Sequence, residues 1–174
     1  MFFTITAVMI GDLQSGTVTE PILTYGALGP LKFFAIFPDG KKYLFANKTT
    51  AHIVDASSDS IIASTLKQAS EIVSVAVSPD GSKVLTGLLA GGATLWDANT
   101  GKTIRNFSAT SQWVSSVAFS SDGKRVLTIS LNGTAKLWDI AKDSAIVTFS
   151  DDVSNRNIES GALSPDGSKL LTSL

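Results

Sequence analysis

Residues 75–102 read VAVSPDGSKVLTGLLAGGATLWDANTGK, a stretch in which short apolar runs alternate with two turn signals. In Pro79-Asp80-Gly81, proline presets a turn-compatible φ, aspartate caps the turn through its side chain, and glycine accepts a positive φ. The second signal is Asp97, which Gly101 follows four residues later. The stretch therefore predicts short strands joined by tight hairpins, and it contains no periodic run of helix length.

The same two signals recur along the whole chain with one period. The first signal is centred on aspartates spaced by 41, 42 and 44 residues, namely Asp39, Asp80, Asp122 and Asp166. The second follows a parallel series with spacings of 43, 42 and 42 residues, namely Asp12, Asp55, Asp97 and Asp139. Two independent markers with a common period near 42 residues identify an internal repeat.

Each period is expected to hold four short strands. Three complete units are predicted, with strands near 32–37, 42–46, 50–54 and 60–66, then 72–77, 83–88, 92–96 and 102–107, then 114–119, 125–130, 134–138 and 145–149. Partial units at the two ends contribute strands near 4–10 and 17–24, and near 158–163 and 168–173. A single domain over residues 1–174 is thus predicted, with units at about 1–30, 31–70, 71–112, 113–155 and 156–174.

Composition narrows the classes of function. The 174 residues carry a net charge of −1, with 44% hydrophobic and 17% charged residues, which suits one folded domain. Near-neutral charge supplies no long-range attraction for nucleic acid or an acidic membrane, so neither is expected as a partner. Zero cysteines and a single histidine exclude thiolate metal sites, a cysteine nucleophile and a histidine-rich metal site.

The apolar segment 1–10 is too short to span a bilayer and has no basic residue before it. We therefore interpret it as a strand and not as a signal peptide, and we expect a cytoplasmic protein.

A period of 40–45 residues with four strands, ending in Trp-Asp, resembles the WD-repeat (WD40) β-propeller family. The resemblance rests on ATLWD at 93–97, TAKLWD at 134–139 and VAFSSDG at 117–123, which is similar to the family's first hairpin. It implies an all-β fold, a β-propeller of four-stranded antiparallel WD40-like blades, with about four blades' worth of strands. It also implies a scaffold that binds proteins or peptides.

The resemblance is incomplete inside the blades. Members of the family often bury a hydrogen-bond network that joins a histidine, a Ser or Thr hydroxyl, an aspartate and the Trp indole. The histidine and hydroxyl positions here correspond to Gln68, Thr110, Leu88 and Ser130. Only the unit with Ser130, Asn132 and Trp138 is expected to keep part of the network, so apolar packing should carry more of the stability. The Trp position is occupied by Val54 and Gly11 in the two N-terminal units.

The strand count leaves the ring open to three interpretations. The chain is expected to begin in the third strand of a blade and to end in the second. The two ends would then pair and close a four-bladed ring, or several chains would complete a larger ring, or the chain is a piece of a longer propeller. We favour the second and third, because WD-repeat propellers usually have about seven blades. An open arc would expose strand edges and invite association.

Three features that resemble chemical sites are interpreted as structural. His52 occupies an outward third-strand position and is expected to be exposed or half-buried, without metal-ligand spacing around it. Gly101-Lys102-Thr103 resembles the tail of a phosphate-binding loop but lies in a strand–strand turn. The repeating aspartates are expected to form turns and not to hold calcium. No catalytic, cofactor-binding or metal-binding residue is therefore predicted, and no cofactor.

Trp113 is the most interesting residue for binding. It precedes a first strand, and the resemblance implies that such inter-blade loops, with the second-to-third strand turns, form the usual partner face. The alternative is that Trp113 packs against the neighbouring blade, which the general burial of large aromatics favours. The candidate partner-binding residues are Glu71, Gln112, Trp113, Asn132, Arg156 and Asn157.

Three functions are weighed from these observations. The leading hypothesis is a non-catalytic scaffold for a protein or peptide partner, with a possible homo-oligomer that completes a larger ring. A propeller enzyme of the hydrolase or lactonase kind is the alternative, but the expected innermost runs at 33–36, 73–76, 115–118 and 160–163 hold no carboxylate. A truncated propeller fragment without independent function is the third.

Overall fold

Short strands make up most of the computed structural model, which describes residues 32–58, 60–108, 112–142, 144–150 and 158–173. The strands are β1 (Phe33–Ile36), β2 (Lys42–Asn47), β3 (Thr50–Asp55), β4 (Ile61–Lys67), β5 (Ile72–Val77), β6 (Lys83–Leu88), β7 (Ala93–Asp97), β8 (Thr103–Phe107), β9 (Ser116–Phe119), β10 (Arg125–Ser130), β11 (Thr134–Asp139), β12 (Ala145–Ser150), β13 (Ser160–Leu163) and β14 (Leu170–Ser173). Every strand expected between residues 32 and 173 is present, with its ends within two residues of the prediction. The strands expected at 4–10 and 17–24 lie outside the described residues.

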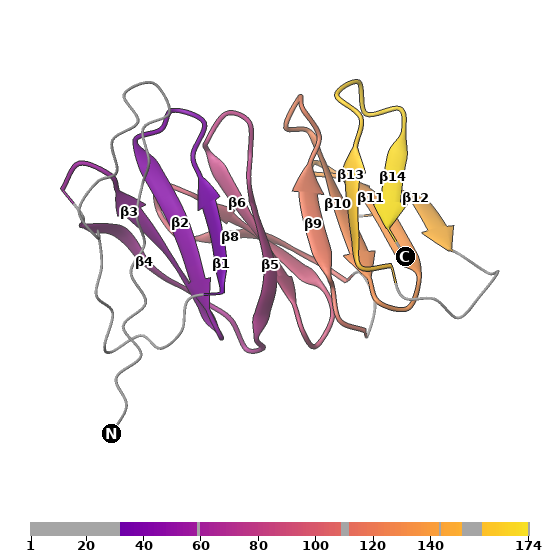
Figure 1. Ribbon diagram of the computed structural model, residues 1–174, viewed down its shortest axis with the longest axis horizontal. Coiled ribbons are helices and arrows are strands. Elements are labelled where there is room, and N and C mark those ends of the chain that lie inside the picture. The colour runs from indigo at the N-terminus through magenta and orange to yellow at the C-terminus, as the bar shows by residue number, and fades with distance from the viewer. Residues whose placement is uncertain (1–31, 59, 109–111, 143, 151–157, 174) are drawn as a thin grey trace.

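The strands form four antiparallel sheets in chain order. Three sheets have four strands each, in the orders β1-β2-β3-β4, β5-β6-β7-β8 and β9-β10-β11-β12, and a fourth sheet pairs β13 with β14. The first strands of successive sheets lie side by side, β1 against β5, β5 against β9 and β9 against β13 (Figure 1). This is the blade arrangement of a β-propeller, so the predicted all-β propeller fold is confirmed; we number the sheets blade 1 to blade 4.

The described part of the array is open, with blade 1 at one end and blade 4 at the other (Figure 1). The expected pairing of the two chain ends involves residues 1–31, which lie outside the described residues. The three ring arrangements therefore stay predictions.

Aspartate side chains build the hairpins, as predicted. In the first turn of blade 2, Asp80 accepts hydrogen bonds from the Ser78 hydroxyl at 2.6 Å and the Ser82 amide at 2.9 Å, and Gly81 has a φ of +68°. The same geometry recurs at Asp122 and Asp166. These donors stabilise the charged carboxylate and so lower its pKa, which for Asp166 falls to about 2 with the Ser164 hydroxyl as the largest cause.

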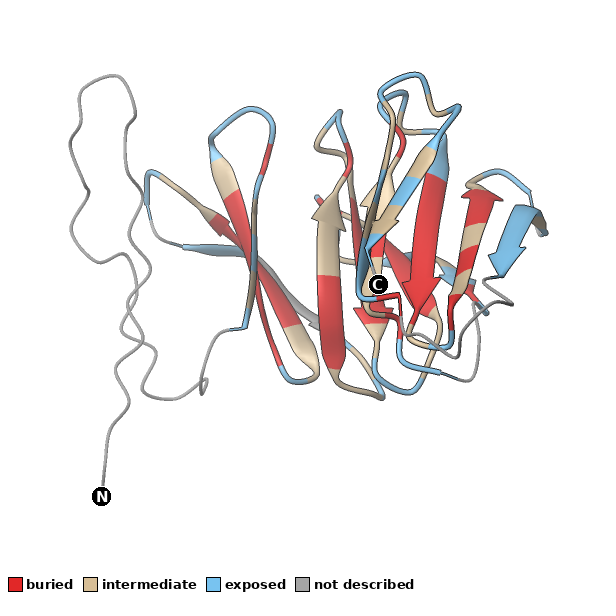
Figure 2. Cartoon of the chain, turned by 45° about the vertical axis from the view of Figure 1, so that its right-hand side comes forward, coloured by how far each residue is buried: buried red, intermediate tan, exposed pale blue. Residues whose placement is uncertain are grey.

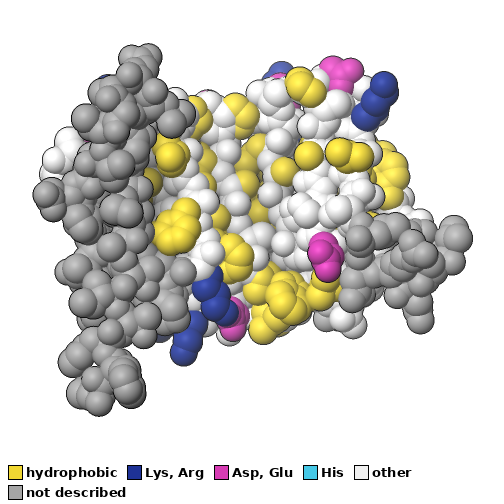
Figure 3. Space-filling model, in the orientation of Figure 1, with side chains coloured by type: hydrophobic (Ala, Val, Ile, Leu, Met, Phe, Trp, Pro, Cys, Tyr) yellow, Lys and Arg dark blue, Asp and Glu magenta, His cyan; other side chains and the backbone are white. Residues whose placement is uncertain are grey.

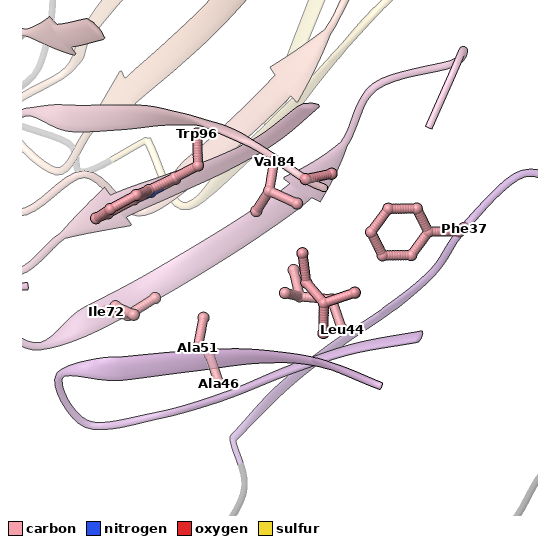
Figure 4. Packing of buried hydrophobic residues seen from close by; sticks show 9 residues of the cluster. Phe37, Leu44, Ala46, Ala51, Ile72, Val84 and Trp96 are labelled. Atoms are coloured by element: carbon pink, nitrogen blue, oxygen red, sulfur yellow. The ribbon is translucent and has the colours of Figure 1, made fainter. Parts of the chain in front are cut away.

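The core lies between the blades. Leu44 and Ala46 of blade 1 pack against Ile72 and Val84 of blade 2, with Phe37 closing one end of the cluster (Figure 4). A second cluster joins blades 2 and 3, and a third joins blade 3 to the β13–β14 sheet. Buried residues therefore concentrate on the inner and middle strands, whereas the outermost β12 is largely exposed (Figure 2).

Candidate functional site

Buried tryptophans anchor the third strands of blades 2 and 3. Trp96 Nε1 donates to Thr86 Oγ1 at 3.0 Å, and Trp138 Nε1 donates to Thr128 Oγ1 at 3.0 Å. Both indole N–H groups thus have a partner in sites where an unpaired donor would be costly.

The expectation about this network was wrong in part. The hydroxyls belong to Thr86 and Thr128, two residues before the expected Leu88 and Ser130, so both blades keep a part of it. Gln68 does take the histidine position, because its Nε2 donates to Thr86 Oγ1 at 3.1 Å. Thr110 lies outside the described residues.

His52 is buried, which corrects the expectation of an exposed or half-buried side chain. Only 5% of it is accessible, and its ring stacks on Phe45 with centroids 4.9 Å apart. Burial lowers the pKa of His52, since the protonated ring would lose its hydration. Among the described residues, neither ring nitrogen has a hydrogen-bond partner. The ring therefore fills a core position.

The connections between strands lie at two opposite ends of the array, and the two ends differ in how many charged residues they contain. The turn end consists of the first-to-second and third-to-fourth strand turns, at 37–41, 56–60, 78–82, 98–102, 120–124, 140–144 and 164–169. It is rich in aspartate and lysine. The loop end consists of the second-to-third strand turns and inter-blade loops, at 48–49, 68–71, 89–92, 108–115 and 131–133. Its segments 89–92, 108–115 and 131–133 contain no charged residue. The last inter-blade connection, 151–159, lies mostly outside the described residues and carries four charged residues.

Backbone hydrogen bonds tie the loop end into a continuous row. Leu89 N donates to Glu71 O at 2.8 Å, Val114 N donates to Leu88 O at 3.1 Å, and Leu131 N donates to Trp113 O at 3.0 Å. Each bond links an inter-blade loop to a second-to-third strand turn or, for Leu88, to the last residue of the second strand before that turn. Segments that carry apolar side chains are thereby held in fixed positions.

Two large apolar side chains on this row face solvent. Leu89 is 40% and Trp113 is 42% exposed. Hydrophobic side chains gather at the lower edge of the face in Figure 3, next to a basic and an acidic side chain. An ion pair lies on the same end, between Lys32 Nζ and Glu71 Oε1 at 2.6 Å.

The structure places four of the six candidate residues at the loop end. Glu71 is paired with Lys32, Gln112 and Trp113 are exposed, and the exposed Asn132 accepts a hydrogen bond from the Thr134 amide at 3.2 Å. Arg156 and Asn157 lie outside the described residues. Leu89 was not among the candidates, although its position in a second-to-third strand turn was a signal for it.

Other kinds of site find little support in the described residues. No three His, Cys, Asp or Glu side chains come together there as metal ligands would. The described part of the chain also has no helix long and apolar enough to cross a membrane.

A comparison with family models agrees with this geometry. Residues 101–139 match the model described as "WD domain, G-beta repeat". No curated protein matches the chain. The matched segment begins in the turn before β8, runs through β9 and β10, and ends on the Trp138-Asp139 pair of β11. WD40 repeats generally mediate protein–protein interactions and are typically non-catalytic. The chain therefore carries a WD40 repeat at residues 101–139, within an all-β array of four-stranded propeller blades.

Proposed function

We propose that this chain is a non-catalytic scaffold whose loop end binds a protein or peptide through the exposed side chains of Leu89 and Trp113. The single observation that carries the proposal is this pair of exposed apolar side chains on segments 89–92 and 108–115, which contain no charged residue. Exposed tryptophan on a rigid frame is a favoured anchor, because it buries a large area at little entropic cost.

The surroundings of the anchor support the same partner class. Gln112 and Asn132 are exposed at its rim, where amide side chains suit hydrogen bonds to a peptide backbone. The Lys32–Glu71 pair flanks the row and satisfies its own charges. A partner segment with an apolar side chain and few charges is therefore the best match. The cytoplasmic location stays a prediction from the sequence alone.

A peptide selection tests this proposal. The purified 174-residue chain is used to select binders from a displayed library of random peptides, and their dissociation constants are measured. We expect apolar peptides whose affinity falls about thirtyfold or more in Trp113→Ala, the usual loss at an aromatic anchor. A smaller loss is expected for Leu89→Ser.

The matched control is Asn99→Ala at the turn end, which should bind the selected peptides as the wild type does. Equal binding by Trp113→Ala and the wild type would refute the proposal, as would peptides whose binding depends on Asn99 and not on Trp113.

A further inference from the structure

Blade 1 gives the loop end a cluster of basic side chains. Lys32 directly precedes β1, Lys48 lies in the turn between β2 and β3, and Lys67 is the last residue of β4. All three residues are exposed. Strand register brings them to the same end of one sheet. Lys67 pairs with Thr50 at the start of β3. The Lys32 amide donates to the carbonyl of Ala46, near the end of β2.

The cluster belongs to blade 1 and not to the repeat. Seven residues before the aspartate of the first turn, blade 1 has Lys32 where blades 2 and 3 have Val73 and Ser115. The residue that pairs with the start of the third strand is Lys67 in blade 1 and Ser150 in blade 3. The second-to-third strand turns of blades 2 and 3 also contain no charged residue. The repeat pattern therefore does not account for three lysines at this end of blade 1.

Two of these positive charges have no acidic partner in the described part of the chain. Glu71 Oε1 lies 2.6 Å from Lys32 Nζ, so these two charges compensate each other. No described carboxylate forms an ion pair with Lys48 or Lys67. The whole chain has a net charge of −1, so the excess of positive charge is local to this end of blade 1.

The backbone conformation of Lys48 is unusual for a lysine. Its φ is +31°, and no other non-glycine residue in the described ranges has a positive φ. Tight hairpin turns usually place Gly or Asn in this conformation, because a Cβ with a longer side chain makes it less favourable. Backbone outliers of this kind cluster at ligand-binding sites. The turn thus presents a charged side chain where glycine would fit more easily.

A single peptide group separates the basic cluster from the apolar anchor. The Ile72 amide donates to Lys48 O. The carbonyl of the same peptide group belongs to Glu71 and accepts from the Leu89 amide. One peptide group and two hydrogen bonds span roughly 8 Å at most between Lys48 O and Leu89 N. Basic side chains accordingly border the hydrophobic ones at the lower edge of the face in Figure 3.

We propose that the loop end binds an acidic segment of a separate protein in one orientation. The apolar side chain of the segment lies on Leu89 and Trp113, and its carboxylates lie beside Lys48 and Lys67. This inference rests on the proposed function and adds the charge of the partner to it. An extended chain advances about 3.3 Å per residue, so the acidic residues are expected about two to four positions from the apolar one.

An acidic protein segment suits both parts of this surface. Its carboxylates complement the two lysines without an acidic partner, and its apolar residue complements the neighbouring segments without charge. A nucleic acid would require positive charge along its whole length, which segments 89–92 and 108–115 do not supply. Exposed charges at the rim of an interface act on orientation and association rate more than on affinity. The acidic residues should therefore add a few-fold in affinity, which salt weakens.

Labelled peptides with matched charges test this inference on the full 174-residue chain. All peptides share a Gly-Ser background and a central Leu-Phe pair, and carry a pair of Glu, Gln or Lys residues on its N-terminal or its C-terminal side. Fluorescence polarisation should rank Glu above Gln above Lys for one of the two placements. We expect about threefold to tenfold between Glu and Gln in about 0.1 M salt, and little difference in about 1 M salt.

Protein variants assign the preference to blade 1. The double variant Lys48→Gln/Lys67→Gln should bind the Glu and Gln peptides equally, and should bind the Gln peptide as the wild type does. The matched control is Lys102→Gln/Lys124→Gln, which removes the same charge from exposed lysines at the turn end and should keep the preference. Thermal unfolding of both variants checks that they are folded.

The outcomes separate this inference from the proposed function. Binding that Trp113→Ala weakens, with equal affinity for the Glu and Gln peptides, would overturn the inference and leave the proposed function standing. An absence of binding that depends on Trp113 would overturn both. A preference for Glu that is lost equally in the turn-end control, or that is the same for both placements, would also overturn the inference. A dimer that Lys48→Gln/Lys67→Gln dissociates, seen by light scattering, would assign the lysines to a second copy of this chain.

Discussion

In blades 2 and 3 the indole N–H of the tryptophan donates to a single threonine hydroxyl. The two threonines, Thr86 and Thr128, differ in how many hydrogen bonds they accept. Thr86 Oγ1 accepts from Trp96 and also from Gln68, whereas Thr128 Oγ1 accepts from Trp138. Thr86 is fully buried and Thr128 is 1% exposed. Loss of either hydroxyl would leave a buried donor without an acceptor.

We therefore expect Thr86→Val and Thr128→Val each to lower the free energy of unfolding by about 1–3 kcal/mol, with Thr86→Val the larger because two donors lose their acceptor. Urea denaturation measures both values. Thr103→Val on the exposed side of β8 is the control and should change stability by less than about 0.5 kcal/mol. Equal stability of Thr86→Val and Thr103→Val would contradict the role of the hydroxyl.

His52 makes the stability of the fold depend on pH near neutrality. Its pKa is lowered in the folded protein, so below the ordinary value of about 6.5 the unfolded chain binds more protons. The contribution of His52 to the free energy of unfolding should be at its maximum above that pH and should fall as the pH is lowered through about 6.5.

The variant His52→Leu removes this titration while keeping an apolar side chain against Phe45. We expect its free energy of unfolding to change less between pH 7.5 and pH 5.5 than that of the wild type. Denaturation midpoints at several pH values provide the measurement. Parallel curves for the two proteins would show that another group governs this range.

The hydrogen bond of Trp96 to Thr86 and the burial of His52 are two features that the sequence analysis did not predict. Residues two apart on a strand share a face, so alternation alone does not distinguish Thr86 from Leu88 as the partner of the indole. The burial of His52 depends on what packs over its face of the sheet, which the strand pattern does not contain. The two tryptophans themselves were recognisable, because Trp96 and Trp138 each lie 16 residues after the first-turn aspartate of their repeat, Asp80 and Asp122.

At the scale of the element, the hairpins are built on ionised aspartates. The pKa of Asp55 is lowered to about 2, with the Ser57 hydroxyl as the largest cause, and that of Asp166 is lowered to the same value through Ser164. Folding therefore favours the carboxylate. The stabilisation is complete above the ordinary aspartate pKa of about 4 and is lost as the pH falls through 2.

We expect the melting temperature to fall between pH 4 and pH 2, and to fall less steeply in Asp166→Asn than in the wild type. Ser164→Ala should resemble Asp166→Asn in this respect, because it removes the largest cause of the lowered pKa. Asn99→Ala, which alters a turn without changing charge, should follow the wild type. Identical acid profiles for all four proteins would argue against the turns as the source.

Strand positions were predictable because turn chemistry marks the hairpins locally. Asp-Gly in the first turn and the second recurring aspartate mark the hairpins of each complete repeat, and the strand ends fell within two residues of expectation. The arrangement of the ring was not predictable, since it depends on contacts between residues far apart in the chain. The exposure of Trp113 likewise depends on how two neighbouring blades meet.

For the molecule as a whole, the main contacts between the described sheets join sheets that are neighbours in the sequence, so the array behaves as a one-dimensional stack. Gly87 lies at the boundary of blades 2 and 3, where an added Cβ would meet the Ser74 hydroxyl and would lie 2.9 Å from Val114 Cγ1. Gly161 lies at the boundary of blades 3 and 4, where a Cβ would meet Ile129 and would lie 2.8 Å from Leu171 O. Each glycine allows two blades to approach closely.

We expect Gly87→Ala to lower the free energy of unfolding by about 1–3 kcal/mol, because the added methyl group overpacks the boundary between blades 2 and 3. The weakened boundary should let the two halves of the array unfold in separate steps. Gly161→Ala should speed hydrogen exchange in β13 and β14 and leave blades 1 and 2 unchanged. Hydrogen exchange read by mass spectrometry distinguishes the two patterns. A single cooperative transition in Gly87→Ala would contradict the stack description.

The two ends of the array differ in one further respect, which bears on how this chain tolerates change. Connections at the turn end have nearly constant length, five residues at 37–41, 78–82 and 120–124 and at 56–60, 98–102 and 140–144, and six at 164–169. At the loop end the lengths vary. The second-to-third strand turns at 48–49, 89–92 and 131–133 have two, four and three residues, and the inter-blade loops at 68–71, 108–115 and 151–159 have four, eight and nine. Insertions are therefore accommodated at the loop end without disturbing the spacing of the blades. This makes residues 89–92 and 131–133 the natural places to graft a foreign binding loop, so that the chain serves as a carrier for recognition sequences other than its own.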